Sequence, residues 1–351
     1  MKASKSEASE FEVVPFEESW RDRWDAYVIA HENSSYSHLR AWADVLMNSL
    51  GHGCESLLAK EGEQVCGVLP LYHVKSLLFG RALVSAPAAN ACGILADNGE
   101  VMQQLIKSAG EKRRQLGCPY VEFRQEGTAL EGLPAKDEYL TTVVSLEEES
   151  ENVRKRISKK IKRDFNRSKR DGLTVENGHE YLDDFYAQYG AHMHRLGSPQ
   201  FSKQFFWAIV DAYGDKAEVV VVRQNSRTVA GNIAIHHRGR INNLYAGAEP
   251  DAMKSGAVSL FCWEQIERGC HNGMREYDLG RSTAGSNSHE YKKYWHGEDV
   301  PYRYAYILGD GEPLPDKETN SMRFQLASKA WRKMPKFLAE WLGPRIVRAL
   351  H

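Results

Sequence analysis

The segment EYDLGRSTAGSNSHEYKKYW, residues 276–295, gathers charged side chains around a short loop of small polar residues. A lysine ammonium can neutralise an oxyanion or a phosphate, and the planar fork of Arg281 suits a phosphate or a carboxylate. Asp278, at the end of an apparent strand, has the chemistry to orient Arg281 or to accept a proton. The segment is therefore the first candidate for a reactive site.

The composition describes a soluble globular chain of two domains, with 351 residues, 42% of them hydrophobic and 26% charged. The N-terminus lacks the apolar stretch of a signal peptide, and the chain has no run of 18 or more apolar residues. We therefore expect a cytoplasmic protein. The six cysteines fall in no metal-binding spacing, so we expect buried thiols and no metal site.

Charge is distributed unevenly, although the formal net charge is only −1. Residues 151–170 carry ten Lys/Arg and two acidic residues, and residues 321–351 carry seven Lys/Arg and one acidic residue. Two basic segments on an acidic body indicate contact with an anionic partner, which would be phosphates, nucleic acid or a charged membrane surface.

Hydrophobic periodicity divides the chain into two halves with one plan. Each half runs through helices to a strand, a polar turn and a strand with an early glycine, in VCGVLPLYHV and in TVAGNIAIHH. A mixed sheet followed by a glycine-bearing turn and a helix is the plan of the GNAT acyltransferase superfamily, in which that turn holds donor phosphates. Lys254 and Gly256 lie at the expected helix start, although a start of this kind can also be a simple cap.

Longer motifs make the resemblance more specific. It extends over nearly the whole chain and includes SHLRAWADVL, RISKKIKRDFNRSKRDGLTV, VAGNIAIHHRGRINNLYAGA and YDLGRSTAGSNSHEYKKYW. These segments resemble the FemAB family, and in particular its branch from PEP-CTERM/exosortase and exopolysaccharide loci. The resemblance implies an α/β fold (α+β mixed sheet) with two tandem GNAT-like acyl-CoA N-acyltransferase domains. The best understood family members transfer an amino acid from aminoacyl-tRNA to an amine on a peptidoglycan precursor.

The late motif of the family runs Asp-Phe-Gly-Arg-Ser, then small residues, then Phe-Lys-x-x-Trp-Gly-Phe. It corresponds here to Asp278, Gly280, Arg281, Ser282, Lys292 and Trp295. The chain departs from the motif after Trp295, where it reads His296-Gly297-Glu298, and residues 151–170 are too short for the long helical arm of the bridge-forming branch.

These correspondences suggest roles in acyl transfer. An amine that attacks an activated carboxyl carbon passes through an oxyanion and must lose a proton. We expect Lys292 to stabilise the oxyanion or to bind an adjacent phosphate. Asp278 would accept the proton of the amine or orient Arg281, and His289 and Glu290 are alternative bases. The competing interpretation is an internal Asp278–Arg281 ion pair that only holds the loop. The candidates for substrate binding are Arg281, Ser282, Asn232, Tyr245, Lys254, Gly256 and Arg163.

We expect an N-terminal GNAT-like domain (1–150), a basic connecting helix (151–172), a C-terminal GNAT-like domain (173–310) and a basic amphipathic tail (311–351). The connector has apolar residues at four-residue steps, namely Val153, Ile157, Ile161 and Phe165. The tail has them at three- and four-residue steps, namely Phe324, Ala327, Trp331, Met334, Leu338, Trp341 and Leu342. Such a tail either packs against the acidic body or lies on the inner face of the membrane.

The sequence therefore predicts an N-acyltransferase that moves an activated carboxyl group to an amine on an envelope or exopolysaccharide precursor. Acyl-CoA or aminoacyl-tRNA would be its co-substrate, with no tightly bound cofactor. The acceptor would be an amine-bearing sugar or a lipid-linked precursor, and tRNA and anionic membrane are further candidate partners. The basic connector lacks interleaved aromatics, which argues against sequence-specific DNA binding. The alternative is a non-catalytic GNAT-fold scaffold for polysaccharide assembly or exosortase-linked sorting.

Overall fold

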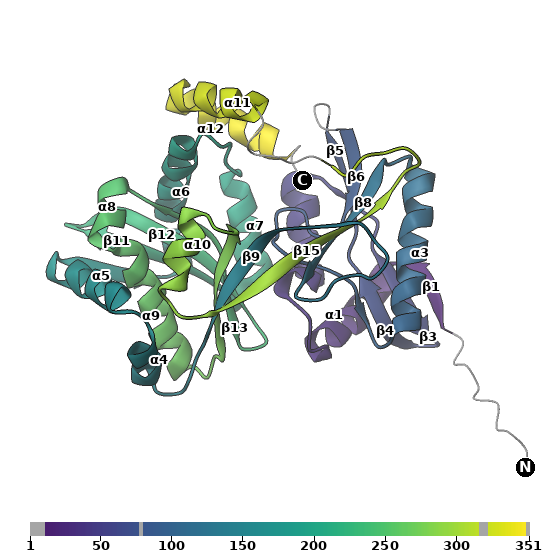
Figure 1. The fold of residues 1–351 in the computed structure, drawn as a ribbon, viewed down its shortest axis with the longest axis horizontal. Helices are drawn as coiled ribbons and strands as arrows, with labels where there is room; N and C mark the ends of the chain where they lie inside the picture. The colour runs from purple at the N-terminus through teal and green to yellow at the C-terminus, as the bar shows by residue number, and fades with distance from the viewer. Residues whose placement is uncertain (1–10, 77–79, 316–321, 349–351) are drawn as a thin grey trace, which may run out of the picture.

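An eleven-stranded mixed sheet runs through both halves of the protein (Figure 1). The structure is a computed structural model that describes residues 11–76, 80–315 and 322–348. The strands of the large sheet follow the order β10-β11-β12-β13-β14-β9-β15-β8-β6-β5-β2. A second sheet, with the order β1-β3-β4-β7, belongs to the first half alone.

The first half is built mainly from strands, with α3 as its longest helix. Its elements are β1 (Glu12–Pro15), η1 (Glu18–Trp20), α1 (Arg21–Ala30), η2 (Tyr36–His38), α2 (Arg40–Val45), η3 (Leu46–Leu50), β2 (Gly53–Cys54), β3 (Leu57–Glu61), β4 (Gln64–Leu69), β5 (Tyr72–Ser76), β6 (Gly80–Val84), β7 (Leu95–Ala96), α3 (Gly99–Leu116), β8 (Tyr120–Glu126) and β9 (Ala135–Ser145). The expected single strand VCGVLPLYHV is divided between β4 and β5, because Pro70 lacks the N–H that a ladder requires.

The second half places helices on both faces of its strands. Its elements are α4 (Ser150–Arg156), α5 (Lys159–Arg170), β10 (Leu173–Asn177), η4 (His179–Tyr181), α6 (Leu182–Leu196), α7 (Lys203–Tyr213), η5 (Gly214–Lys216), β11 (Ala217–Gln224), β12 (Arg227–His237), β13 (Arg240–Ala248), α8 (Pro250–Ser255), α9 (Ala257–His271), β14 (Glu276–Thr283), α10 (Asn287–Lys293), β15 (Glu298–Leu308), α11 (Met322–Lys333) and α12 (Lys336–Val347).

The connector differs from the expected single helix. Ile157 and Ser158 have extended backbones and separate α4 from α5, and the Ser158 side chain accepts the Ile161 amide to begin the second helix. All four residues of the predicted apolar stripe are buried. The stripe was therefore predicted correctly, whereas the continuous helix was wrong.

Two strands join the halves into one sheet. β9 of the first half lies between β14 and β15, and it pairs antiparallel with both. β15 in turn pairs antiparallel with β8 of the first half. The predicted domain limits at 1–150 and 173–310 therefore divide a single sheet. The place where β9 pairs with β14 and β15, which we call the junction, combines residues from both halves.

Aromatic packing also holds the halves together. Trp42 on α2 meets Phe205 on α7 with ring centroids 6.1 Å apart and nearly perpendicular planes. The Tyr213 hydroxyl donates to the Tyr36 carbonyl at 2.8 Å. One continuous buried cluster contains all four of these side chains, so the interface is part of the protein core.

The second core lies beneath α5 and α9, where Phe165 and Trp263 stack with ring centroids 5.2 Å apart. Gly256 begins α9 with φ of +89°, and a Cβ built there would lie 2.5 Å from the Asp164 carbonyl oxygen on α5. The Ser168 hydroxyl donates to the Ser255 carbonyl at 2.7 Å. Helix α5 therefore packs directly on the start of α9.

The C-terminal helices α11 and α12 lie together at one edge of the molecule, over α6 (Figure 1). The Ser328 hydroxyl donates to the Gly197 carbonyl at 3.0 Å, and Trp331 is buried. Trp341, in contrast, is exposed. The predicted stripe is thus divided between the core and the surface; the Phe324 side chain lies outside the described residues.

Within residues 11–76, 80–315 and 322–348, no helix is long and apolar enough to cross a bilayer. The six cysteines are free thiols, four of them buried and two partly buried. The described residues contain no group of three or more His, Cys, Asp or Glu side chains placed to hold a metal ion.

The contact between Gly256 and α5 can be tested with a pair of substitutions. Gly273→Ala places a side chain at φ of +70° with nothing within 4 Å, so it should lower the free energy of unfolding by about 1–2 kcal/mol. Gly256→Ala adds a backbone clash and should cost at least about 1 kcal/mol more. Denaturant unfolding of both variants measures the difference, and equal losses would show that α5 does not constrain Gly256.

Candidate active site

Strands β13 and β14 run parallel for three residue pairs, from Arg240 opposite Glu276 to Asn242 opposite Asp278, and their pairing then ends. At this point the register of β14 against β9 also shifts, between Asp278 and Arg281. Gly280, with φ of +78°, makes this irregularity possible, because a left-handed backbone strains other residues. The backbone carbonyls of Gly280 and Arg281 are therefore available to accept hydrogen bonds from a side chain.

Lys292 on α10 supplies that donor. Its Nζ donates to the Gly280 carbonyl at 2.6 Å and to the Arg281 carbonyl at 3.1 Å. The side chain is 8% exposed, and burial lowers the pKa of its ammonium to about 8. An ammonium has three N–H donors, and the described residues occupy two of them. One donor therefore remains for a bound oxygen atom.

Arg281 lies next to this lysine but faces a different environment. Its guanidinium lies 4.7 Å from the centre of the Tyr139 ring, and its Nη1 donates to the Tyr304 hydroxyl at 3.4 Å. No carboxylate among the described residues lies within ion-pair distance of it. The side chain is exposed, so most of its N–H fork is open to an anionic ligand.

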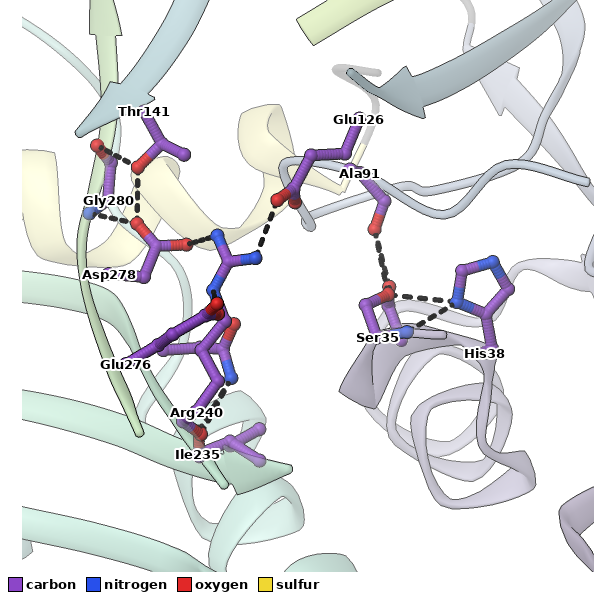
Figure 2. Close-up of polar contacts among 12 residues, drawn as sticks. Ser35, His38, Ala91, Glu126, Thr141, Ile235, Arg240, Glu276, Asp278 and Gly280 are labelled. Atoms are coloured by element: carbon purple, nitrogen blue, oxygen red, sulfur yellow. Dashed lines mark hydrogen bonds and ion pairs between the residues drawn. The ribbon is translucent and has the colours of Figure 1, made fainter. Parts of the chain in front are cut away.

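The predicted ion pair between Asp278 and Arg281 is wrong. Asp278 instead accepts from Arg240 Nη2 at 2.7 Å, and Arg240 Nη1 also donates to Glu126 at 2.5 Å (Figure 2). The second Asp278 oxygen accepts the Gly280 amide at 2.7 Å and a hydroxyl from Thr141. Asp278 therefore orients the Gly280 turn, and Arg240 is its charge partner.

The two alternative bases have different surroundings. His289 is buried; one ring nitrogen lies 2.7 Å from Asp299 and the other accepts the Gly285 amide at 3.1 Å. Both of its nitrogens are thus engaged within the loop. Glu290 is exposed and pairs with the neighbouring Lys293 at 2.7 Å, as expected for a solvated helix face.

The predicted phosphate residues lie at the end of α8, which carries Lys254, and at the start of α9, where Gly256 lies. Lys254 is exposed and pairs with Asp251 at 3.1 Å, and Gly256 packs against α5. Arg163 is exposed on α5. The Tyr291 hydroxyl lies 2.8 Å from Ser259 Oγ, which joins the first turn of α9 to the helix that carries Lys292.

The remaining candidates occupy the strands beside the lysine. Ser282 is buried with its Oγ 3.2 Å from Ser288. Asn232 is 1% exposed, and its Oδ1 has no hydrogen-bond partner in the described protein. Asn243 Oδ1 is buried without a partner in the same way. The Tyr245 hydroxyl donates to Ala88 of the first half at 2.6 Å, so Tyr245 bridges the two halves.

Sequence reasoning missed the residues that belong to the junction. Arg240 and Glu126 are separated by 114 positions, and no local pattern connects them. The tyrosines were detectable, because residues 302, 304 and 306 alternate along β15 and therefore share one face. Tyr304 is the member that contacts Arg281.

Comparison with known proteins shows which fold the chain shares. Residues 151–293 match the acetyltransferase (GNAT) domain family. No curated protein matches the sequence. The crystal structure of FemX aligns over 85% of this chain and 98% of its own, with a TM-score of 0.66 at 15% identity.

Two further structures have a similar fold. The C-terminal domain of a protein assigned as a lysylphosphatidylglycerol synthetase, from Agrobacterium fabrum, has a TM-score of 0.55 at 16% identity over 83% of this chain and 93% of its own. A tandem GNAT protein from the clavulanic acid biosynthesis pathway has a TM-score of 0.54 at 9% identity, over 88% and 100%. With a GNAT domain over residues 151–293 and an overall fold similar to those of FemX and a tandem GNAT protein, the chain has the tandem GNAT fold.

Proposed function

We propose that the protein is an N-acyltransferase whose reaction takes place beside Lys292. The observation that carries this proposal is the buried ammonium with two donors held by the Gly280 and Arg281 carbonyls and a third donor left over. In a site that excludes water, such a donor stabilises the oxyanion formed when an amine attacks an activated carboxyl carbon. The attacking nitrogen forms a bond to the carbonyl carbon, and the bond from that carbon to the ester oxygen or thioester sulfur of the donor breaks. The proton lost by the amine ends on the departing group, which leaves as an alcohol or a thiol.

We assign the acceptor to the side of the site where Arg281 lies. An exposed guanidinium beside Tyr139, with no carboxylate partner among the described residues, suits an acceptor that carries a phosphate or carboxylate. Amine-bearing sugars and lipid-linked precursors of the cell envelope or of exopolysaccharide have this chemistry. The cytoplasmic face of the membrane is where such precursors would meet the enzyme.

The donor is acyl-CoA or aminoacyl-tRNA, and the packing at Gly256 bears on the choice. Asp164 and Ser168 of α5 contact the start of α9, which is the place expected for donor phosphates. This packing favours a donor whose phosphates bind elsewhere, such as an aminoacyl ester. It also favours the second candidate function, a GNAT-fold scaffold without catalysis.

Replacing Lys292 tests the reaction directly. Purified protein is incubated with acetyl-CoA or aminoacyl-tRNA and an amino-sugar phosphate, and the product is measured by mass spectrometry. Lys292→Met should reduce the turnover number about 10²–10³-fold, because one oxyanion donor is lost. Lys293→Met changes the adjacent exposed lysine and should leave turnover unchanged. If the Lys292→Met variant turns over as fast as the wild type, Lys292 has no role in the reaction. If the wild type transfers nothing from either donor, the scaffold function is favoured.

The pKa of Lys292 predicts a pH dependence. The charged form provides the third donor, so the contribution of Lys292 is nearly complete at pH 7 and is lost as the pH rises through the pKa of about 8. A lysine with an ordinary pKa would remain charged to about pH 10. The ratio of wild-type to Lys292→Met turnover removes the titration of the acceptor amine itself. We expect this ratio to fall between pH 7 and pH 9; a constant ratio would contradict the assignment.

Arg281 is expected to act in binding. Arg281→Lys keeps the positive charge but loses the planar fork, so the KM for a phosphorylated acceptor should rise about tenfold while the turnover number changes little. Arg303→Lys alters a half-buried arginine on β15 that pairs with Asp137, and it serves as the matched control. A lower melting temperature with unchanged KM would instead identify Arg281 as a structural residue.

A further inference from the structure

Helices α11 and α12 present an exposed apolar surface that has no partner in the described protein. Exposure reaches 68% for Phe337, 60% for Leu326, 58% for Trp341 and 37% for Leu338. These residues differ from the ones that attach the helices to the body. Ala339, Gly343 and Val347 form the buried side of α12, so Phe337 and Trp341 lie on its opposite side.

Attachment of the two helices to the body is well defined, which makes their outer face a fixed surface. The Arg332 guanidinium donates to the Leu196 carbonyl at 3.1 Å, and one ring nitrogen of His194 lies 2.9 Å from the Met334 carbonyl oxygen. A Cβ built at Gly343 would lie 3.1 Å from the backbone nitrogen of Gln200, so α12 packs closely on the segment after α6. Figure 1 shows both helices along the outer edge of the molecule.

Basic side chains surround the apolar residues. The other exposed cations of the two helices are Lys329, Lys333, Lys336 and Arg345, whereas Arg332 and Arg348 lie against the body at Gly197 and Gly51. The Arg345 guanidinium lies 4.2 Å from the centre of the Trp341 ring. Glu340 is the acidic residue of α12, and it pairs with Lys336 at 3.6 Å. Large apolar side chains therefore project from the middle of a strongly positive surface.

We propose that this face, made by Phe337, Leu338, Trp341 and the neighbouring cations, docks on an anionic lipid bilayer. Tryptophan and phenylalanine insert at the boundary between headgroups and acyl chains, while lysine and arginine contact anionic headgroups. A second copy of the chain is a poorer partner, because two identical faces would bring like charges together. Membrane docking would hold the enzyme beside lipid-linked acceptors, and only this purpose depends on the proposed function.

The surface differs from the one that the sequence pattern suggested. The predicted stripe included Trp331, which is buried, and omitted Phe337, which is 68% exposed. The break before α12, at Pro335, changes the direction of the chain between them. The structure therefore specifies which substitutions test membrane docking without disturbing the core.

The experiment is co-sedimentation of the full chain with vesicles of phosphatidylcholine alone or with 30 mol% phosphatidylglycerol, at low and high salt. We expect binding to the anionic vesicles that weakens with salt. Phe337→Ser/Trp341→Ser removes the apolar contact and should lower the partition coefficient at least about tenfold. Lys333→Glu/Lys336→Glu should lower it by more than about 25-fold, since each basic side chain contributes roughly fivefold.

Matched controls are Trp207→Ser on α7 and Lys107→Glu on α3, which change exposed residues of the same types on other helices. Both controls should bind like the wild type, and so should Lys292→Met, which separates docking from catalysis. Equal binding to both kinds of vesicle, or unchanged binding by the two double variants, would overturn the proposal. Dimerisation in sedimentation velocity that Phe337→Ser/Trp341→Ser abolishes, without any vesicle binding, would instead identify a second copy as the partner.

Discussion

The half-buried guanidinium of Arg240 makes the ion pairs on which the site depends. It lies between Asp278 of the second half and Glu126 of the first, and removing it would leave the buried carboxylate of Asp278 and the half-buried one of Glu126 without a counter-charge. Leaving a buried carboxylate such as that of Asp278 unpaired commonly costs about 3–5 kcal/mol. Asp278, held by Arg240, accepts the Gly280 amide, and the Gly280 carbonyl accepts from Lys292. The position of the candidate catalytic lysine thus follows from a charge cluster that spans both halves.

The cations of the junction differ in what they contact. Arg124 and Arg240 are both compensated, by Glu122 and by Asp278 with Glu126, so their charges serve the structure. Arg281 has aromatic neighbours and no carboxylate within ion-pair distance in the described residues. An uncompensated, accessible guanidinium beside a buried ammonium gives the site a positive potential, which would raise the local concentration of an anionic acceptor.

The fold supports many chemistries, so the activity must be argued from these side chains and not from the fold alone. The structural neighbours at 9–16% identity establish the tandem GNAT architecture. The contact of α5 with Gly256 is the feature of this chain that bears most directly on the donor, because the N–H groups at a helix start are a ready site for phosphate. The contact between α5 and Gly256 therefore bears on whether a phosphate of the donor can bind at the start of α9.

The sequence by itself determined the local features. The apolar stripe of the connector is buried as predicted, and the segment 276–295 places Lys292 beside Arg281. These predictions succeeded because spacing along one helix or loop decides which side chains can meet. The tertiary structure alone decided that Asp278 pairs with Arg240 and Glu126, that β9 and β15 join the two halves, and that Trp331 is buried while Trp341 is exposed. Each of these depends on contacts between distant segments, which local periodicity does not encode.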